Sequence, residues 1–268
     1  MSVTFETKCW EKDYKFVLNE EYLRNKIANC NYNFDRKVII INNVNNREDV
    51  VKYAKTLQKK SIIDTYYFVD DYVDQVLEYF HLTKESFINQ KGNGYYYSIS
   101  ELTSIYLCET DYIFHFASDV EMKTSYKSWI SEALHLLEST DSYIAARPTF
   151  NGKFYYEDQK KEYELDKWFV GYWFTDHCYL AKMSVLKNPE VYHEDNDLTC
   201  RCYPPYGGRD FEYMIDAYIR NHNLYILTSK TVAYQHTNWS QERKRHTLKV
   251  YYYYVIDKIR NIVFALKK

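Results

Sequence analysis

Two acidic side chains follow an apolar run in the segment FHFASDVEM, which spans residues 114–122. Asp119 and Glu121 are separated by one residue, and the run before them has the composition of a buried strand. Carboxylate oxygens suit Mg²⁺ and Mn²⁺, and a cation held in this way can neutralise a diphosphate. The D-x-E spacing therefore predicts a divalent-metal site, with a polar strand terminator as the alternative.

A further acidic position, Asp210, lies in the segment GGRDFEYMIDAYIRNHNLYILTSKTVAYQH, residues 207–236. The pattern after it predicts a helix over 211–221 with an inward apolar stripe, so Asp210 stands at the start of a well-packed helix. A carboxylate held there could act as a general base toward an acceptor hydroxyl, and a helix cap is the alternative role. Glu212 lies about 200° around the helix from Asp210 and is not expected to share that task.

Asp176 lies between these two segments, in YWFTDHCYLAK. Its position between them makes it a candidate for the same polar site, and a surface turn is the alternative interpretation. The 31 tyrosines of the chain suit a sugar ligand, because a tyrosine ring covers apolar sugar faces while its hydroxyl forms hydrogen bonds.

The elements that must position these residues alternate between strands and helices in the first half of the chain. Strands are expected at 3–7, 37–43, 65–69 and 111–116, with helices from 19, at 48–57, at 72–80 and at 98–108. Such alternation is typical of βαβ units, so the fold class is α/β with a mostly parallel central sheet and flanking helices. Ligands of these sheets bind outside the carboxyl ends of the strands, where Thr7, Asn42, Asn43 and Asp119 fall.

The second half of the chain has a less regular pattern. Strands are expected at 143–148, 171–181 and 224–234. Residues 151–167 are expected to form a lid or binding loop, and residues 194–208 a further loop. A basic, tyrosine-rich helix is expected over 241–266. The sequence has neither G-x-G-x-x-G after the first strand nor G-x-x-x-x-G-K-[ST]. The absence of these motifs argues against a dinucleotide-binding fold and a P-loop.

The order of these motifs resembles that of nucleotide-sugar-dependent glycosyltransferases with the GT-A fold, particularly family 2. The segment SISELTSIYLCETDYIFHFASDV is similar to their helix and strand leading into the D-x-D motif. The segment from Gly207 to His236 is similar to their E-D segment with its helix, strand and trailing histidine. The resemblance covers Val3 to His236, so we expect a GT-A-like domain over 1–240 and a C-terminal helical appendage over 241–268.

The resemblance implies a role for individual residues. Asp119 matches the last Asp of D-x-D, which reaches the metal and the diphosphate, with Glu121 as a possible second ligand. Asp210 matches the general base of inverting members, and His236 a histidine that completes the metal or diphosphate site. Thr7, Asn42 and Asn43 would border the nucleotide base and ribose. Asp176, between the metal segment and the base segment, would bind the donor and orient the donor or the acceptor sugar.

Three positions depart from the pattern of the family. Ala117 stands in place of the first Asp of D-x-D, Arg209 in place of the Glu of E-D, and Asn42 in place of an aspartate after the second strand. These changes weaken the expectation of a metal more than that of the fold.

The predicted function is transfer of a sugar from a nucleoside-diphosphate sugar to a glycan or lipid-linked acceptor, inverting and dependent on Mn²⁺ or Mg²⁺. A nucleotidyltransferase and a non-catalytic nucleotide- or glycan-binding module are the alternatives. The 35 basic and 37 acidic residues nearly balance, so no nucleic-acid partner is expected. We expect a cytoplasmic protein, because the N-terminus lacks the apolar core of a signal peptide. The C-terminal helix would pack on the core, contact the inner membrane face peripherally or pair in a homodimer.

Overall fold

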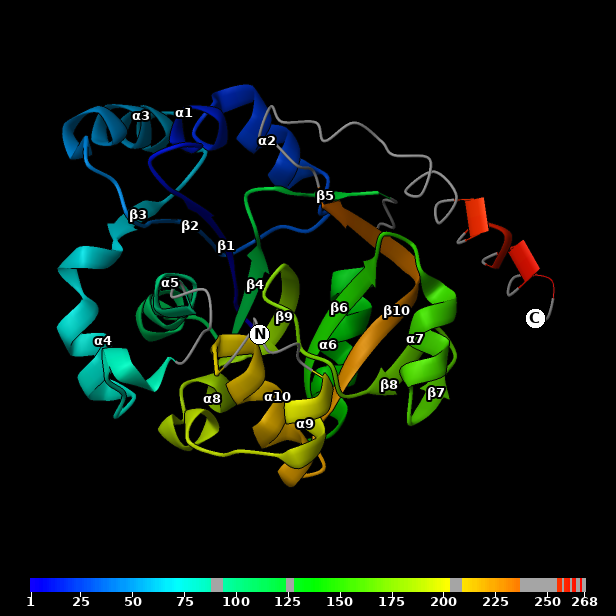
Figure 1. Cartoon of the computed structure of the whole chain (residues 1–268). Helices are drawn as coiled ribbons and strands as arrows, with labels where there is room; N and C mark the ends of the chain where they lie inside the picture. The colour runs from blue at the N-terminus through cyan, green and yellow to red at the C-terminus, as the bar shows by residue number, and fades with distance from the viewer. Residues whose placement is uncertain are drawn as a thin grey trace.

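The computed structural model describes residues 1–87, 94–123, 128–202 and 209–236, together with a few positions between 255 and 266. In this part of the chain, ten strands form one mixed sheet, and helices cover both of its faces (Figure 1). The strands are β1 (Val3–Cys9), β2 (Arg36–Ile41), β3 (Thr65–Phe68), β4 (Tyr112–Phe116), β5 (Val120–Met122), β6 (Tyr143–Phe150), β7 (Tyr163–Leu165), β8 (Trp168–Gly171), β9 (Cys178–Lys182) and β10 (Tyr225–His236).

The helices connect these strands along the chain. They are α1 (Tyr14–Val17), α2 (Glu20–Ala28), α3 (Arg47–Lys59), α4 (Val73–Tyr79), α5 (Gly94–Leu107), α6 (Trp129–Ser139), α7 (Phe154–Lys160), α8 (Met183–Leu186), α9 (Asp197–Cys202) and α10 (Phe211–Asn221). Short 3₁₀ helices lie at η1 (Val69–Asp71), η2 (Lys84–Ser86) and η3 (Pro189–Tyr192).

The sheet has the order β3-β2-β1-β4-β9-β6-β10-β8-β7, with β5 paired to β10. The first four strands in this order run parallel, as βαβ connections require, and β6 and β10 are also parallel. Strand β9 runs against both β4 and β6, so its beginning lies beside the carboxyl end of β4. This register places the connection before β9 next to the loop after β4.

Each face of the sheet has its own core, and strand β2 shows why its sequence is apolar throughout. Its side chains alternate, with Ile39 and Ile41 in one cluster and Val38 and Ile40 in the other. Buried residues of α1, α2, α3 and α6 complete the first cluster, and those of α4, α5, α8 and α10 complete the second. The expected α/β class with flanking helices is confirmed.

Several expected boundaries in the second half are wrong. The strand expected over 171–181 is two strands, because β8 ends at Gly171 and β9 begins at Cys178. The loop expected over 151–167 contains α7 and β7, and the loop expected over 194–208 contains α9. Helix α6 was not expected, although four of its apolar residues recur at helical spacing and are buried: Ile130, Ala133, Leu134 and Leu137.

The helix expected over 241–266 lies outside the described residues apart from isolated positions, so its proposed packing stays a prediction. Within the described chain, no helix is both long enough and apolar enough to cross a lipid bilayer.

Candidate functional site

Asp119 and His236 lie against each other at the carboxyl ends of β4 and β10. Asp119 follows β4 by three residues, and His236 is the last residue of β10, which β5 joins as an antiparallel neighbour. The Asp119 Oδ2 and His236 Nε2 atoms are 2.9 Å apart, and both side chains are about one third exposed, at 37% and 30%. Two residues that are far apart in the sequence therefore meet at an accessible edge of the sheet.

The electrostatic surroundings keep Asp119 ionised. Burial opposes ionisation, but the hydrogen bond and charge of His236, with a contribution from His177, lower the pKa of Asp119 below its ordinary value. The ring of His177 packs against that of His236, with ring centres 5.2 Å apart. The structure therefore places His177 beside the Asp119–His236 pair.

The geometry of the pair fits a divalent cation. Two ligands of one cation at about 2.1 Å lie about 3 Å apart, which matches the separation of the Asp119 and His236 atoms. In the described residues, no three Asp, Glu, His or Cys side chains are arranged to hold a metal ion. Mg²⁺ commonly takes one or two protein ligands and completes its shell with substrate phosphates and water. The pair therefore fits a cation that shares its coordination with a diphosphate.

Glu121 faces away from this pair. Strand β5 pairs with β10 so that Val120 stands opposite His236, and side chains alternate along a strand. Glu121, the next residue, stands opposite Gln235 instead and lines a recess of about 260 Å³ beside α2. The structure does not bring Glu121 to the Asp119–His236 pair.

Three carboxyl groups gather near the same edge: Asp176, Asp210 and Glu212. Asp176 lies in the connection 172–177, two residues before Cys178, which pairs with Phe116 at the end of β4. The backbone N–H of Asp176 donates to Glu212 Oε1 at 2.7 Å. The predicted base and the predicted sugar-orienting residue are thus brought together, next to the loop that carries Asp119.

Asp210 caps helix α10. Its backbone is extended, with φ −112° and ψ −174°, and its side chain accepts a hydrogen bond from the N–H of Tyr213 at 3.1 Å. Burial raises the pKa of Asp210 to about 6, and the negative charge of Asp176 adds to this effect. Both roles weighed for Asp210 are compatible, since a capping carboxylate with this pKa is also suited to accept a proton near neutral pH.

Glu212 was not expected to share the task of Asp210, because a separation of about 200° around the helix was assumed, yet the charges of the two groups interact. That expectation assumed helical geometry at both residues, but Asp210 has extended backbone and lies outside the helix. Burial raises the pKa of Glu212 well above its ordinary value, and the charges of Asp176 and Asp210 raise it further. Its Oε1 accepts the hydrogen bond from the N–H of Asp176, so Glu212 holds the connection that carries Asp176.

Helix α10 holds the connection 172–177 at a second point, one turn further along. Asp216 is fully buried and accepts hydrogen bonds from the N–H of Trp173 at 3.0 Å and from Thr199 Oγ1 at 2.7 Å. Arg220 Nε donates to the same carboxylate at 2.6 Å. Trp173 has a left-handed backbone, with φ 63°. The two acids on the helix, Glu212 and Asp216, therefore fix the connection that carries Asp176 and His177.

Asp13 is a further acid near the site, which the sequence placed only among the polar residues after β1. Its side chain accepts hydrogen bonds from Ser118 Oγ at 3.0 Å and from the N–H of Trp10 at 2.8 Å. Burial raises the pKa of Asp13 to about 6, and the nearby charge of Asp119 contributes. Its position after β1 was the only signal that the sequence offered.

The three residues expected to border the nucleotide lie in different surroundings. Thr7 is fully buried, and its hydroxyl donates to the carbonyl oxygen of Phe116 at 2.6 Å, so the structure does not bring its side chain to the site. The amide of Asn42 donates to the carbonyl oxygen of Tyr96 in α5 at 2.8 Å. Asn43 is exposed with a left-handed backbone, at φ 51°. Asn42 and Asn43 remain at the carboxyl end of β2, as predicted.

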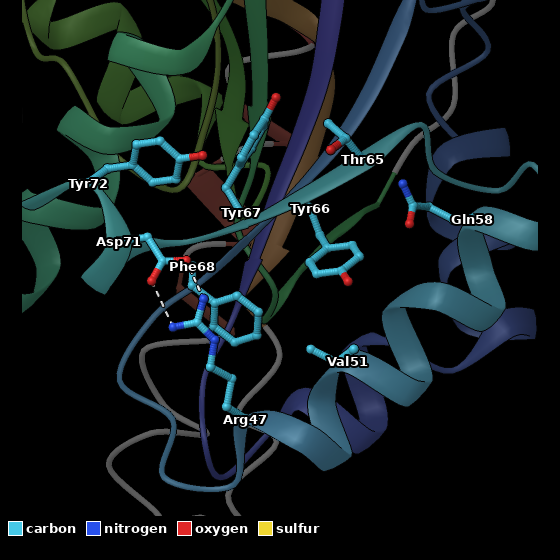
Figure 2. Close-up of a pocket in the computed structure, with 9 residues that line it drawn as sticks. All are labelled: Arg47, Val51, Gln58, Thr65, Tyr66, Tyr67, Phe68, Asp71 and Tyr72. Atoms are coloured by element: carbon cyan, nitrogen blue, oxygen red, sulfur yellow. Dashed lines mark hydrogen bonds and ion pairs between the residues drawn. The ribbon is translucent and has the colours of Figure 1, made fainter.

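A larger recess, of about 390 Å³, lies along β3 at the edge of the sheet (Figure 2). Helix α3 and the turn after β3 form its sides, and its two charged residues, Arg47 and Asp71, pair with each other at 2.7 Å. The ring of Phe68 packs under the Arg47 guanidinium at 3.9 Å. None of its lining residues belongs to the Asp119, Asp176 or Asp210 surroundings.

Solved structures provide the comparison with known proteins. The chain superposes on the crystal structure of GalNAc-T7 with UDP, GalNAc and Mn²⁺ at a TM-score of 0.52 and 6% identity, covering 89% of this chain and 44% of that one. The crystal structure of mouse xyloside xylosyltransferase 1 in its apo form superposes with a TM-score of 0.45 and 13% identity, covering 84% of each chain. The crystal structure of residues 1–349 of S. aureus TarS with UDP-GlcNAc superposes with a TM-score of 0.43 and 8% identity, covering 97% of this chain and 66% of that one.

No protein-family model matches the chain, and no curated protein matches it either. The similarity to GalNAc-T7 is at the level of fold, and it confirms the expected GT-A fold.

Proposed function

We propose that this chain is a glycosyltransferase that moves a sugar from a nucleoside-diphosphate sugar to a hydroxyl of a glycan or lipid-linked acceptor. The observation that carries the proposal is the Asp119–His236 pair, whose atoms lie 2.9 Å apart at the carboxyl end of the sheet. The GT-A fold supports it, and so does the presence of UDP and Mn²⁺ in the GalNAc-T7 structure.

Mn²⁺ or Mg²⁺ would be held by Asp119 Oδ2 and His236 Nε2, the two ligand atoms that the fold brings together. When bound, the cation would neutralise charge on the leaving diphosphate. His177 lies beside His236 and adds to the polar surroundings of Asp119. Asn42 and Asn43, after β2, would border the nucleotide.

Asp210 is the proposed general base. Its pKa of about 6 leaves it ionised near pH 7 while keeping its proton affinity above that of an ordinary carboxylate. The hydrogen bond from Tyr213 fixes its carboxylate, and Asp176, close by, would orient the sugar. Proton transfer from an acceptor hydroxyl to Asp210, opposite the leaving diphosphate, corresponds to an inverting displacement.

A non-catalytic nucleotide-binding module is the second candidate, and the two replaced acids favour it. Ala117 supplies no carboxylate, and Arg209 pairs with Asp195, with Nη1–Oδ1 at 3.0 Å. The raised pKa of Asp210 favours catalysis over this candidate, because a carboxylate with a pKa of about 6 is suited to act as a general base.

Thermal unfolding with nucleoside diphosphates and Mn²⁺ tests donor binding. A nucleotide present at 100 times its Kd stabilises the fold by about 2.7 kcal/mol, which raises Tm by roughly 5–10 °C. We expect one nucleoside diphosphate to do so only with the metal, and Asp119→Ala to abolish the effect. If no nucleoside diphosphate changes Tm under any condition, the proposal is wrong.

A further inference from the structure

The loop that carries Asp119 is held from behind by a buried lysine of helix α2. Lys26 is 5% exposed, and its ammonium donates to the carbonyl oxygen of Ala117 at 2.8 Å and to that of Val120 at 2.6 Å. One turn earlier on the same helix face, the hydroxyl of Tyr22 donates to the carbonyl oxygen of Ser118 at 2.7 Å. Residues on both sides of Asp119 are therefore fixed by α2.

Burying an ammonium group costs free energy unless other groups replace its hydrogen bonds to water, and the surroundings of Lys26 provide such groups. Burial lowers the pKa of Lys26 to about 8, whereas the charges of Asp119 and Glu121 favour the ammonium form. The ring of Phe116, the last residue of β4, lies 4.0 Å from Nζ and provides a cation–π contact. The carbonyl groups and this ring together replace water around the ammonium.

The contacts of Lys26 also connect the two halves of the Asp119–His236 pair. Val120 begins β5 and stands opposite His236 in the ladder with β10. The ammonium binds the Val120 carbonyl on one side of Asp119 and the Ala117 carbonyl on the other. Movement of this loop would change the separation between Asp119 Oδ2 and His236 Nε2, on which cation binding depends.

We propose that Lys26 is a positioning residue for the donor site, holding the 117–120 loop so that Asp119 and His236 can share one cation. The effect on cation binding rests on the proposed function. The positioning of the 117–120 loop rests on the hydrogen bonds of Lys26 alone. At position 117 the chain uses the backbone carbonyl of an alanine, where the resemblance leads us to expect a carboxylate. The lysine fixes the loop through that carbonyl.

Lys26→Met tests the proposal, because methionine fills a similar volume and donates no hydrogen bond. Arg24→Met is the matched control, since Arg24 lies on the same helix and, within the described residues, its side chain bonds to Glu20 alone, at 3.1 Å. Hydrogen exchange of peptides covering 116–122 should become at least tenfold faster in Lys26→Met, with the 211–221 helix unchanged in both variants. Equal protection of the loop in wild type and Lys26→Met would overturn the positioning role.

Calorimetry with Mn²⁺ and UDP then tests the consequence. We expect Lys26→Met to bind about 10–100-fold more weakly, the usual effect of removing a group that orients a metal ligand, and Arg24→Met to bind as the wild type does. A lower Tm with unchanged affinity would show a role in stability alone. If the wild type itself fails to bind, the proposed function fails, whereas the exchange result still decides whether Lys26 holds the loop. Should Lys26→Met not fold, Tyr22→Phe removes one contact to the same loop and should speed its exchange.

Discussion

Replacing Asp210 by asparagine should stabilise the fold while removing sugar transfer. Asparagine retains an oxygen that can accept from the N–H of Tyr213, and it caps helices about as well as aspartate. It removes a carboxylate whose pKa is raised from 3.8 to about 6 in the folded protein. The native state therefore binds more protons than the unfolded chain between these values, and the stability contributed by this group is lost as pH rises through them.

The size of the effect follows from the shift. About two pKa units correspond to about 3 kcal/mol of unfolding free energy at pH 8, where Asp210 is ionised in both states, and to about 0.5 kcal/mol at pH 4. Solvent near this partly exposed group reduces the figure, so we expect Asp210→Asn to gain about 1–3 kcal/mol at pH 8. The gain should nearly vanish at pH 4.

Urea unfolding at the two pH values measures this difference, and sugar transfer is measured in parallel at pH 8. Asp210→Ala is the control, because it removes the charge and also the cap, which is worth about 0.5–2 kcal/mol. A gain that is equal at pH 4 and pH 8, or a loss at pH 8, would refute the argument that burial raises this pKa. Retained transfer would refute the assignment of Asp210 as the base.

Substitutions at three further positions test separate parts of the structure. Asp119→Asn should weaken manganese-dependent binding of UDP at least about tenfold in calorimetry, and an unchanged Kd would contradict its role as a ligand. Glu212→Gln keeps an oxygen that can accept from the N–H of Asp176 and should change the free energy of unfolding little, whereas Glu212→Ala removes this acceptor and should cost about 1–3 kcal/mol in urea unfolding. Equal losses of stability in the two variants would mean that this hydrogen bond is not what Glu212 contributes. Gly171→Ala should lower the free energy of unfolding by about 1–3 kcal/mol, because a Cβ there would lie 3.1 Å from the carbonyl oxygen of Lys160. Unchanged stability would show that the backbone at Lys160 moves to make room for the methyl group.

The regular half of the fold follows from local patterns. Strand β2 is apolar throughout because both of its faces are buried, and helix α2 begins after Asn19, whose side chain accepts from the N–H of Tyr22. Asp119 was predicted from its place after β4, and His236 from the resemblance to GT-A glycosyltransferases. These features depend on neighbours in the sequence, or on the rule that parallel strands end at one edge.

The features that sequence patterns missed depend on contacts between distant segments. Lys26 lies on an amphipathic helix, where a lysine ordinarily indicates an exposed face, and only the loop after β4 makes it buried. Glu212 was excluded by assuming that Asp210 is helical. The interruption between Gly171 and Cys178 was hidden because its residues are aromatic, like those of the strands around it. A signal for Glu212 and for the interruption was present in α10, since Glu212 and Asp216 lie one turn apart on the same face of that helix.

Turnover of a panel of nucleotide sugars, followed by the release of nucleoside diphosphate, tests the central claim most directly. We predict that the wild type releases the diphosphate from one donor class in the presence of Mn²⁺ or Mg²⁺ and transfers the sugar when an acceptor is added. Asp119→Ala should lose donor binding and release, whereas Asp210→Asn should bind the donor and fail to transfer. Release that is absent with every donor, or that is unchanged in both variants, would contradict the assignment of this site to sugar transfer.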